Sequence, residues 1–366
     1  MAKYLRNIIN IFLFYLSCHK MVGTFKILTL SAALEEKKIN LFEDYYYDTG
    51  SIKVASARIK CWKAGGHGSE SYLQVVQNSC NPGFVIMGQK LGTDKLYEYV
   101  EKFGFTQKTG IDLNGEATGI MFKKDKIGPV EQATISFGQG ISVTPIQQVT
   151  GVSAAINGGT LYKPYVLKYI TEPETNNIIL ENNKVEVRKT ISEETSKLVR
   201  ETLESVVSEG TGKNAFIENY RVGGKTGTAQ KVKDGAYMSN NYITSFMGFF
   251  PADKPEYVVY VAVDNAKGIT QYGGTIAAPI AKNIMKSIIN IDEVPQSTEP
   301  KERIYTWLDT KYIKTPDLIG KTIKEAKKIT TGFNFEYSGE GEKIIYQEPQ
   351  PNIYVKENSI LKVMLN

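Results

Sequence analysis

The sequence predicts a mixed α/β fold of the α+β type, in which helices pack on an antiparallel sheet, followed by a small second α+β domain. Helix-like and strand-like stretches alternate from Lys26 to about Asn290 without a long break. Near residue 250, two apolar runs flank a proline-containing pentapeptide, which is typical of a β-hairpin. From Asp292 to Thr310 the composition becomes polar, which indicates a linker between two domains.

Four helices are predicted ahead of the hairpin. The first is apolar and is expected to be buried, whereas the second and the fourth carry apolar residues at helical spacing. The third begins at Thr144-Pro145, an N-cap followed by a proline in the first helical position, and it ends before a glycine pair. The predicted bounds are 25–34, 93–103, 145–156 and 192–208.

The hairpin is placed at 243–250 and 257–263, and a helix over 276–289, apolar nearly all round, is expected to lie against it. Beyond the linker, a short amphipathic helix (321–329) and strands near 334–337, 344–348 and 360–365 form the second domain. The predicted organisation is an N-terminal segment (1–22), a large domain (23–291), a linker (292–311) and a small domain (312–366).

The N-terminal segment has the composition of an export signal. Lys3 and Arg6 precede an apolar run over residues 8–16. A membrane span needs about twenty apolar residues, so the run fits the hydrophobic region of a signal better. Two interpretations stay open, an export signal or residues foreign to the fold, and association with a membrane stays open with them.

Charge and composition exclude some functions. The formal charge is +5 without a basic cluster, which argues against nucleic acid as a partner. The histidines are His19 and His67, and the cysteines are Cys18, Cys61 and Cys80. Such small numbers argue against a His/Cys zinc site, and neither a metal nor another cofactor is predicted.

Two short motifs match a known arrangement for acyl transfer. They are Ser79-Cys80-Asn81 and Lys225-Thr226-Gly227. Acyl transfer through serine needs a nucleophile, a nearby base and donors for the developing oxyanion. One solution combines Ser-x-x-Lys on a helix with a Ser-x-Asn loop and a Lys-Thr-Gly strand. Each tripeptide alone is weak evidence, and a second Lys-Thr-Gly at 108–110 is interpreted as structural because no hairpin follows it.

Longer stretches around these motifs resemble class B penicillin-binding proteins. The resemblance covers roughly residues 23–290 and is carried by FGQGISVTPIQQVTGVSAAINGGTLYKPYV (137–166) and GGKTGTAQK (223–231). A further stretch, 58–84, is similar to the sporulation-specific members, and TPDLIGKTIKEAKK (315–328) resembles part of a PASTA module. The resemblance implies a penicillin-binding/β-lactamase-like transpeptidase fold plus a PASTA domain.

The family also implies a function. Its members are peptidoglycan D,D-transpeptidases of cell-wall synthesis, which cross-link stem peptides by serine acyl transfer and bind β-lactams; the sporulation-specific members serve the spore cortex. The expected location is the cell envelope of a Gram-positive-type bacterium, on the outer face of the cytoplasmic membrane, if the chain is exported.

Catalytic roles follow from the resemblance, position by position. Lys26 matches the lysine that takes the nucleophile's proton. Ser79 matches the serine that relays protons to the leaving group, and Asn81 matches the side chain that holds the acyl-chain amide.

Substrate-binding roles fall on the second motif. Lys225 and Thr226 match the pair that binds the carboxylate of the substrate or of a penicillin. Gly227 belongs to the same wall of the site, and the backbone N–H of Thr228 matches one oxyanion donor.

The sequence departs from the family at the nucleophile. The family reads Pro-Gly-Ser-Thr-Phe-Lys, whereas this chain has Gly23 at the serine position, followed by Thr24. Thr24 is two residues from Lys26 and would point away from it on a helix. Ser17-Cys18-His19-Lys20 fits Ser-x-x-Lys but lies in the export-like segment. We therefore expect an inactive site, in a fold that is incomplete at its N-terminus, encoded by a broken gene or by a dedicated pseudoenzyme.

Cys61 and Cys80 form a candidate redox pair, and Cys80 is the middle residue of the Ser-x-Asn motif. In an exported protein the pair favours a disulfide across the wall of the site, with a thiol–disulfide oxidoreductase as a possible partner. The alternative is two buried thiols that pack as small hydrophobic groups. Both interpretations stay open.

Two functions fit these residues. The first is a peptidoglycan D,D-transpeptidase-like protein that has lost its nucleophile. The alternative is a non-catalytic protein that binds peptidoglycan or muropeptides. A β-lactamase is disfavoured because the sequence shows no Glu-x-x-x-Asn deacylation motif near the site.

Overall fold

The computed structural model describes residues 19–20, 23–233, 236–267, 271–303 and 312–366. Most of the export-like segment and the end of the predicted linker lie outside these residues. The chain divides into two compact units, residues 1–303 (unit 1) and 304–366 (unit 2). The boundary falls inside the segment that the sequence places as a linker.

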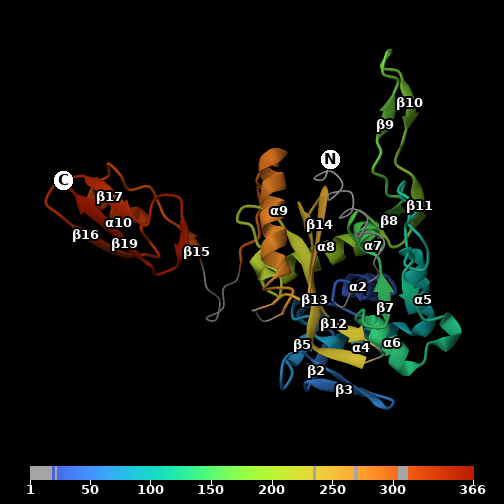
Figure 1. The fold of residues 1–366 in the computed structure, drawn as a ribbon. Helices are drawn as coiled ribbons and strands as arrows, with labels where there is room; N and C mark the ends of the chain where they lie inside the picture. Colours follow the sequence, from blue (N-terminus) through green and yellow to red (C-terminus); the bar gives the residue numbers. More distant parts are fainter. Residues whose placement is uncertain (1–18, 21–22, 234–235, 268–270, 304–311) are drawn as a thin grey trace. The chain divides into compact units, whose positions relative to one another are not determined.

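Unit 1 contains helices and short strands around one longer sheet (Figure 1). Its helices are α2 (Lys26–Glu35), α3 (Tyr72–Gln77), α4 (Asn81–Leu91), α5 (Thr93–Lys102), α6 (Pro129–Ser136), α7 (Pro145–Ile156), α8 (Glu193–Ser208) and α9 (Ala277–Ile291). Its strands are β1 (His19–Lys20), β2 (Tyr45–Asp48), β3 (Ser51–Val54), β4 (Ala57–Lys60), β5 (Gly68–Ser71), β6 (Ile120–Met121), β7 (Ile141–Val143), β8 (Thr160–Tyr162), β9 (Tyr169–Thr171), β10 (Ile178–Glu181), β11 (Glu186–Lys189), β12 (Gly223–Lys233), β13 (Ala236–Phe250) and β14 (Tyr257–Asp264).

The central sheet has the order β12-β13-β14, and both pairings are antiparallel. Successive side chains of a strand point to opposite faces, and β13 shows this alternation. Met247 and Phe249 enter the core that includes α2 and α8, whereas Phe246 and Phe250 enter the core that includes α9. The sheet therefore lies between α9 on one face and the other helices on the opposite face (Figure 1).

Helix α2 lies in the middle of the helical layer. It contacts α4, α5, α7 and α8, and its residues from Lys26 to Ala33 are buried. A helix that is buried on all sides needs apolar residues all round, which explains the sequence KILTLSAALE. Lys26, its first residue, is therefore carried into the interior of unit 1.

Two small hairpins lie beside the N-terminus of α4. Strand β2 pairs with β5, and β3 pairs with β4, both antiparallel. Helix α3 follows β5 directly, and a capping box of Ser71 and Gln74 fixes its start. The sequence alone did not predict these hairpins, α3 or α4.

Most of the remaining predictions for unit 1 are confirmed, including the fold class. Helix α7 has the predicted bounds and capping residues. The Lys-Thr-Gly motif lies inside β12, whereas the sequence placed it just before the strands. Helix α9 lies against the sheet, as predicted, and its apolar residues Ile280 and Ile284 are exposed on the side away from it.

The first residues of the predicted linker belong to unit 1. Val294 is buried, and its carbonyl accepts a hydrogen bond from the Tyr220 hydroxyl at 3.2 Å. The Ser297 N–H donates to the Asn219 carbonyl at 2.9 Å. The chain thus leaves unit 1 later than the composition indicated.

Unit 2 has its own hydrophobic core. Strand β19 (Ile360–Leu365) lies between β16 (Asn334–Ser338), which is parallel to it, and β17 (Ile344–Glu348), which is antiparallel. Helix α10 (Ile323–Ile329) covers this sheet, and β15 (Tyr312–Lys314) pairs with β18 (Tyr354–Lys356). Leu318, Ala326, Ile344, Leu361 and Val363 form the core.

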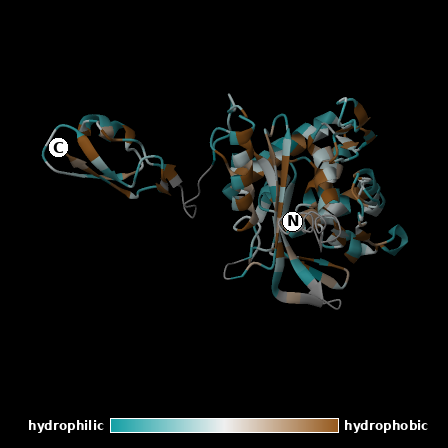
Figure 2. Cartoon of the chain, turned by 45° about the horizontal axis from the view of Figure 1, so that its top comes forward, coloured by the Kyte–Doolittle hydropathy of each residue, from teal (hydrophilic) through white to brown (hydrophobic). Residues whose placement is uncertain are grey.

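Apolar residues concentrate inside each unit. Figure 2 shows hydrophobic colour along the strands of the central sheet, with hydrophilic colour on many of the surrounding loops. Within the residues described, the structure contains no helix with both the length and the apolar character needed to cross a bilayer.

Candidate active site

Lys26 joins α2 to the Ser-x-Asn loop. The residue is 2% exposed, and its Nζ donates hydrogen bonds to the Ser79 carbonyl oxygen (2.8 Å), to Ser79 Oγ (3.0 Å) and to Asn81 Oδ1 (2.7 Å). The Phe84 ring lies 5.0 Å from the same nitrogen. Three acceptors match the three donors of an ammonium group, so this loop supplies a hydrogen-bond partner for each donor of the buried Lys26 side chain.

The loop itself is a tight connection between α3 and α4. Ser79 has φ +56°, a left-handed conformation that costs a non-glycine residue about 1–2 kcal/mol. Its N–H donates to the Val76 carbonyl at 3.1 Å. Cys80 then caps α4, because its Sγ accepts from the Gly83 N–H at 3.4 Å. Asn81 is therefore the first residue of α4, and its side chain reaches Lys26.

The Lys-Thr-Gly motif lies on β12, an edge strand of the sheet. Lys225 is fully buried, and burial, with the nearby charge of Lys26, holds its pKa well below the usual 10.5. Thr226 Oγ1 lies 3.0 Å from Thr211 Oγ1. Thr228 Oγ1 accepts a hydrogen bond from the Gly273 N–H at 3.1 Å. The side chains of Thr226 and Thr228 are therefore hydrogen-bonded to other groups of the protein.

Gly23 lies against the Lys-Thr-Gly motif. It has φ +96°, and its N–H donates to the Phe137 carbonyl at 3.3 Å. A Cβ added at this position would lie 2.4 Å from the Thr226 carbonyl oxygen and 2.6 Å from Gly227 Cα. The backbone at position 23 thus packs directly against the Lys-Thr-Gly strand, and glycine presents no side-chain oxygen there.

The electrostatics of Lys26 suit a general base. Burial lowers the pKa of Lys26 from 10.5 to about 7, although Cys80 and Cys61 act in the opposite direction. A neutral amine near pH 7 can accept a proton from a hydroxyl. The hydroxyl that it contacts is that of Ser79, whereas residue 23 has none.

The stability of the chain is expected to rise with pH because of Lys26. Between pH 7 and 10.5 the unfolded lysine holds a proton that the folded one has lost, so the free energy of unfolding increases with pH, by at most about 1.4 kcal/mol per pH unit. Urea unfolding at pH 7, 8 and 9 should show a steeper rise for the natural chain than for Lys26→Met. The exposed Lys53→Met serves as control, and equal slopes in the natural chain and Lys26→Met would contradict the prediction.

The structure brings together most of the residues that the sequence singled out. Lys26, Ser79 and Asn81 are in direct contact, and Gly23 lies against Thr226 and Gly227. The second Lys-Thr-Gly copy lies elsewhere in the chain, where the Glu116 carboxylate accepts hydrogen bonds from the Thr109 and Gly110 N–H groups at 2.7 and 3.0 Å. The sequence did not point to Thr211, because only the fold brings it to Thr226.

Cys61 and Cys80 are free thiols in the structure, and both are buried. A hydrogen bond between their sulfurs lowers the pKa of Cys61, and the same hydrogen bond and burial raise that of Cys80. The ligand atoms of Asp48 and His67 lie within 4.8 Å of both sulfurs. The argument against a His/Cys metal site counted only histidines and cysteines, whereas the fold adds the Asp48 carboxylate to them.

Comparison with known proteins identifies the family. Residues 23–286 match the penicillin binding protein transpeptidase domain, and residues 313–366 match the PASTA domain. The chain belongs to the penicillin-binding transpeptidases, as the sequence resemblance predicted. It is 55% identical over 349 residues to stage V sporulation protein D of Bacillus subtilis, a match that covers 95% of this chain and 54% of that protein.

Solved structures show the same fold. The apo transpeptidase domain of Burkholderia pseudomallei penicillin-binding protein 3 is 27% identical with a TM-score of 0.71, over 81% of this chain and 85% of that one. Penicillin-binding protein 3 of Mycobacterium tuberculosis, in complex with ampicillin, is 28% identical with a TM-score of 0.70, over 77% and 64% of the two chains. The chain spans about half the length of the curated relatives it matches.

Proposed function

We propose that this chain carries the transpeptidase and PASTA domains of a peptidoglycan D,D-transpeptidase-like protein of the cell envelope, and that it does not itself catalyse acyl transfer. Its similarity to stage V sporulation protein D supports a role in spore formation, in synthesis of the spore cortex. A relative from Mesostigma viride, 30% identical over 298 residues, is named a peptidoglycan D,D-transpeptidase FtsI homolog.

One observation carries the proposed lack of catalysis: a base is in place without a nucleophile. In the family reaction, the serine oxygen attacks the stem-peptide carbonyl, gives its proton to the lysine and expels D-alanine; an amine then takes up the acyl group. Lys26 is buried and has a pKa near 7. The residue three positions before it is Gly23, which has no oxygen to offer. Loss of the nucleophile from a serine enzyme lowers turnover by about 10⁶-fold.

Stem peptides and β-lactams are the proposed ligands. Mycobacterium tuberculosis penicillin-binding protein 3 has been solved with ampicillin and with aztreonam. In this chain Lys225, Thr226 and Thr228 are proposed to meet the ligand's carboxylate and carbonyl.

The second candidate function is non-catalytic binding of peptidoglycan. The separately folded unit 2, which matches the PASTA domain, favours it. On either proposal, nucleic acid is not a partner.

The pair Cys61 and Cys80 supports a redox proposal. Oxidation would join the two sulfurs, and two protons and two electrons would pass to the disulfide of an oxidoreductase, which becomes a dithiol. Because Cys80 lies between Ser79 and Asn81, the bond would shift both side chains away from Lys26.

One experiment tests both parts of the proposed function. The full chain is incubated with purified peptidoglycan rich in uncross-linked pentapeptides, the wall material is sedimented, and bound protein and released D-alanine are measured. We expect the protein in the pellet and D-alanine at the level of the protein-free blank. Release above the blank would disprove the lack of catalysis, and protein that stays in the supernatant would disprove the wall-directed function.

A further inference from the structure

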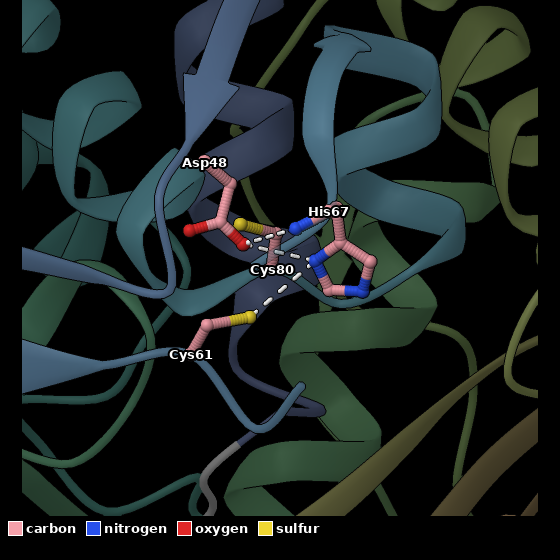
Figure 3. Close-up of side chains that lie close together, drawn as sticks. All are labelled: Asp48, Cys61, His67 and Cys80. Carbon is pink, nitrogen blue, oxygen red and sulfur yellow. Dashed lines mark hydrogen bonds and ion pairs between the residues drawn. The ribbon is translucent and has the colours of Figure 1, made fainter. Parts of the chain in front are cut away.

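Four side chains with metal-binding atoms converge beside the Ser-x-Asn loop. Asp48 ends β2, Cys61 follows β4, His67 precedes β5, and Cys80 caps α4. Their donor atoms all lie within 4.8 Å of one another. Figure 3 shows the carboxylate, the two sulfurs and the imidazole Nδ1 turned toward one another. We call these four residues the Asp-Cys-His-Cys cluster.

Two distances within the cluster are close to those of a tetrahedral ligand set. Cys61 Sγ lies 3.4 Å from His67 Nδ1, and His67 Nδ1 lies 3.0 Å from Asp48 Oδ2. Around zinc, the usual metal–ligand lengths place tetrahedral ligands roughly 3.6 Å apart for sulfur and nitrogen, and roughly 3.4 Å apart for nitrogen and oxygen. These two pairs therefore lie within a few tenths of an ångström of that geometry, and the remaining donor atoms are within 4.8 Å of one another.

The cluster is buried, and other groups orient its ligands. The side chains of Asp48 and His67 are 0% and 5% exposed. Asp48 Oδ1 accepts from the Gly50 N–H at 2.8 Å, and Oδ2 accepts from the His67 N–H at 3.0 Å. Such hydrogen bonds to ligating carboxylates are typical of metal sites.

Two buried polar atoms without a hydrogen-bond partner in the described part of the chain lie beside the cluster. His67 Nε2 and Glu70 Oε2 have no hydrogen-bond partner among the described residues. Since Nδ1 faces the cluster, a metal on Nδ1 would fix the proton on Nε2. Glu70 Oε2 lies 3.7 Å from His67 Nδ1, and Glu70 Oε1 accepts from Asn78 Nδ2 at 2.7 Å, which places one more anionic group beside the cluster.

We propose that Asp48, Cys61, His67 and Cys80 bind one Zn²⁺ ion in a closed structural site. Two thiolates, an imidazole and a carboxylate form a ligand set that zinc prefers, and four protein ligands leave no open position for catalysis. The proposal does not rest on the proposed function, because it concerns side chains outside the acyl-transfer machinery.

The metal would position the Ser-x-Asn loop. Cys80 stands between Ser79 and Asn81, which both contact Lys26. Asn81 Nδ2 also donates to the Lys60 carbonyl, at 3.4 Å, one residue before Cys61. Zinc would tie the ends of the two small hairpins to the start of α4. A disulfide between Cys61 and Cys80 would exclude the metal, since zinc needs both sulfurs as thiolates.

The test measures metal in the full chain, purified under reducing conditions without chelators. Elemental analysis should find one zinc per chain, and Cys61→Ser and His67→Gln should lower it at least tenfold. Cys18→Ser, which removes the cysteine outside the cluster, is the matched control and should keep the zinc. After exchange with Co²⁺, thiolate-to-cobalt absorption near roughly 300–400 nm and intense bands near roughly 600–750 nm should appear, as for tetrahedral sulfur ligation.

The cobalt spectrum is measured on the unmodified chain, so a variant that fails to fold does not decide the outcome. Zinc below about 0.1 per chain together with no cobalt–thiolate absorption would overturn the proposal. Zinc that persists in both variants would also overturn it, and so would stoichiometric iron or copper in place of zinc.

Discussion

Alanine or serine at position 23 is expected to destabilise unit 1 by about 2–5 kcal/mol, the sum of two effects. The first is conformational, because Gly23 has φ +96°. The second is steric, because a Cβ would lie 2.4 Å from the Thr226 carbonyl oxygen and 2.6 Å from Gly227 Cα. Both obstacles are backbone atoms of a paired strand, so neither can move away as a flexible side chain could.

Gly92→Ala separates the two effects. Gly92 has φ +85°, and nothing lies within 4 Å of a Cβ added there. Urea unfolding of Gly23→Ala and Gly92→Ala should show the larger loss for position 23. Equal losses would mean that the walls of the site are not packed as described. The comparison also applies to Gly23→Ser, which would add the missing hydroxyl. The serine Cβ can be accommodated only if the backbone at position 23 moves away from β12.

Local signals explain what the sequence predicted well. The capping pair Thr144-Pro145 fixes the start of α7 through hydrogen bonds within one turn, so its bounds could be read directly. The apolar run after Gly23 predicted a buried helix, and α2 is buried. Two apolar runs on either side of a turn-rich pentapeptide predicted β13 and β14, and both faces of β13 lie on a core.

Features that depend on distant segments were not predictable in the same way. Gly23 was noticed for its missing hydroxyl, but its φ and its contact with Thr226 follow from packing against β12. The Asp-Cys-His-Cys cluster has no Cys-x-x-Cys spacing and includes Asp48, which no pattern in the sequence singled out. Two hairpins and a helix cap assemble it, and the sequence did not predict those hairpins.

The family roles of the site residues came from resemblance, and the structure supplies geometry for them. Contacts of Lys26 with Ser79 and Asn81 at 2.7–3.0 Å are compatible with proton transfer through this group. The roles of Lys225, Thr226 and Thr228 in binding a ligand stay predictions. In the structure each of these side chains forms a hydrogen bond with another protein group.

The second large effect expected is the absence of acylation by penicillins. Acylation joins a serine oxygen to the β-lactam carbonyl carbon, breaks the ring C–N bond and delivers the serine proton to the ring nitrogen. Gly23 has no side-chain oxygen that could attack the β-lactam. Thr24 is fully buried. The Ser79 hydroxyl lies 3.0 Å from Lys26 Nζ, so it is the alternative nucleophile that the measurement must detect.

The central claim, a penicillin-type site that lacks its nucleophile, is tested most directly by intact-mass spectrometry of the full chain after incubation with benzylpenicillin. A penicillin-binding transpeptidase that has the motif serine is the positive control, and it should gain the mass of one penicillin. We predict that this chain keeps its mass, because acylation falls by about 10⁶-fold without the nucleophile. A mass increase of one penicillin, mapped to Ser79 or to any other residue of unit 1, would contradict the claim.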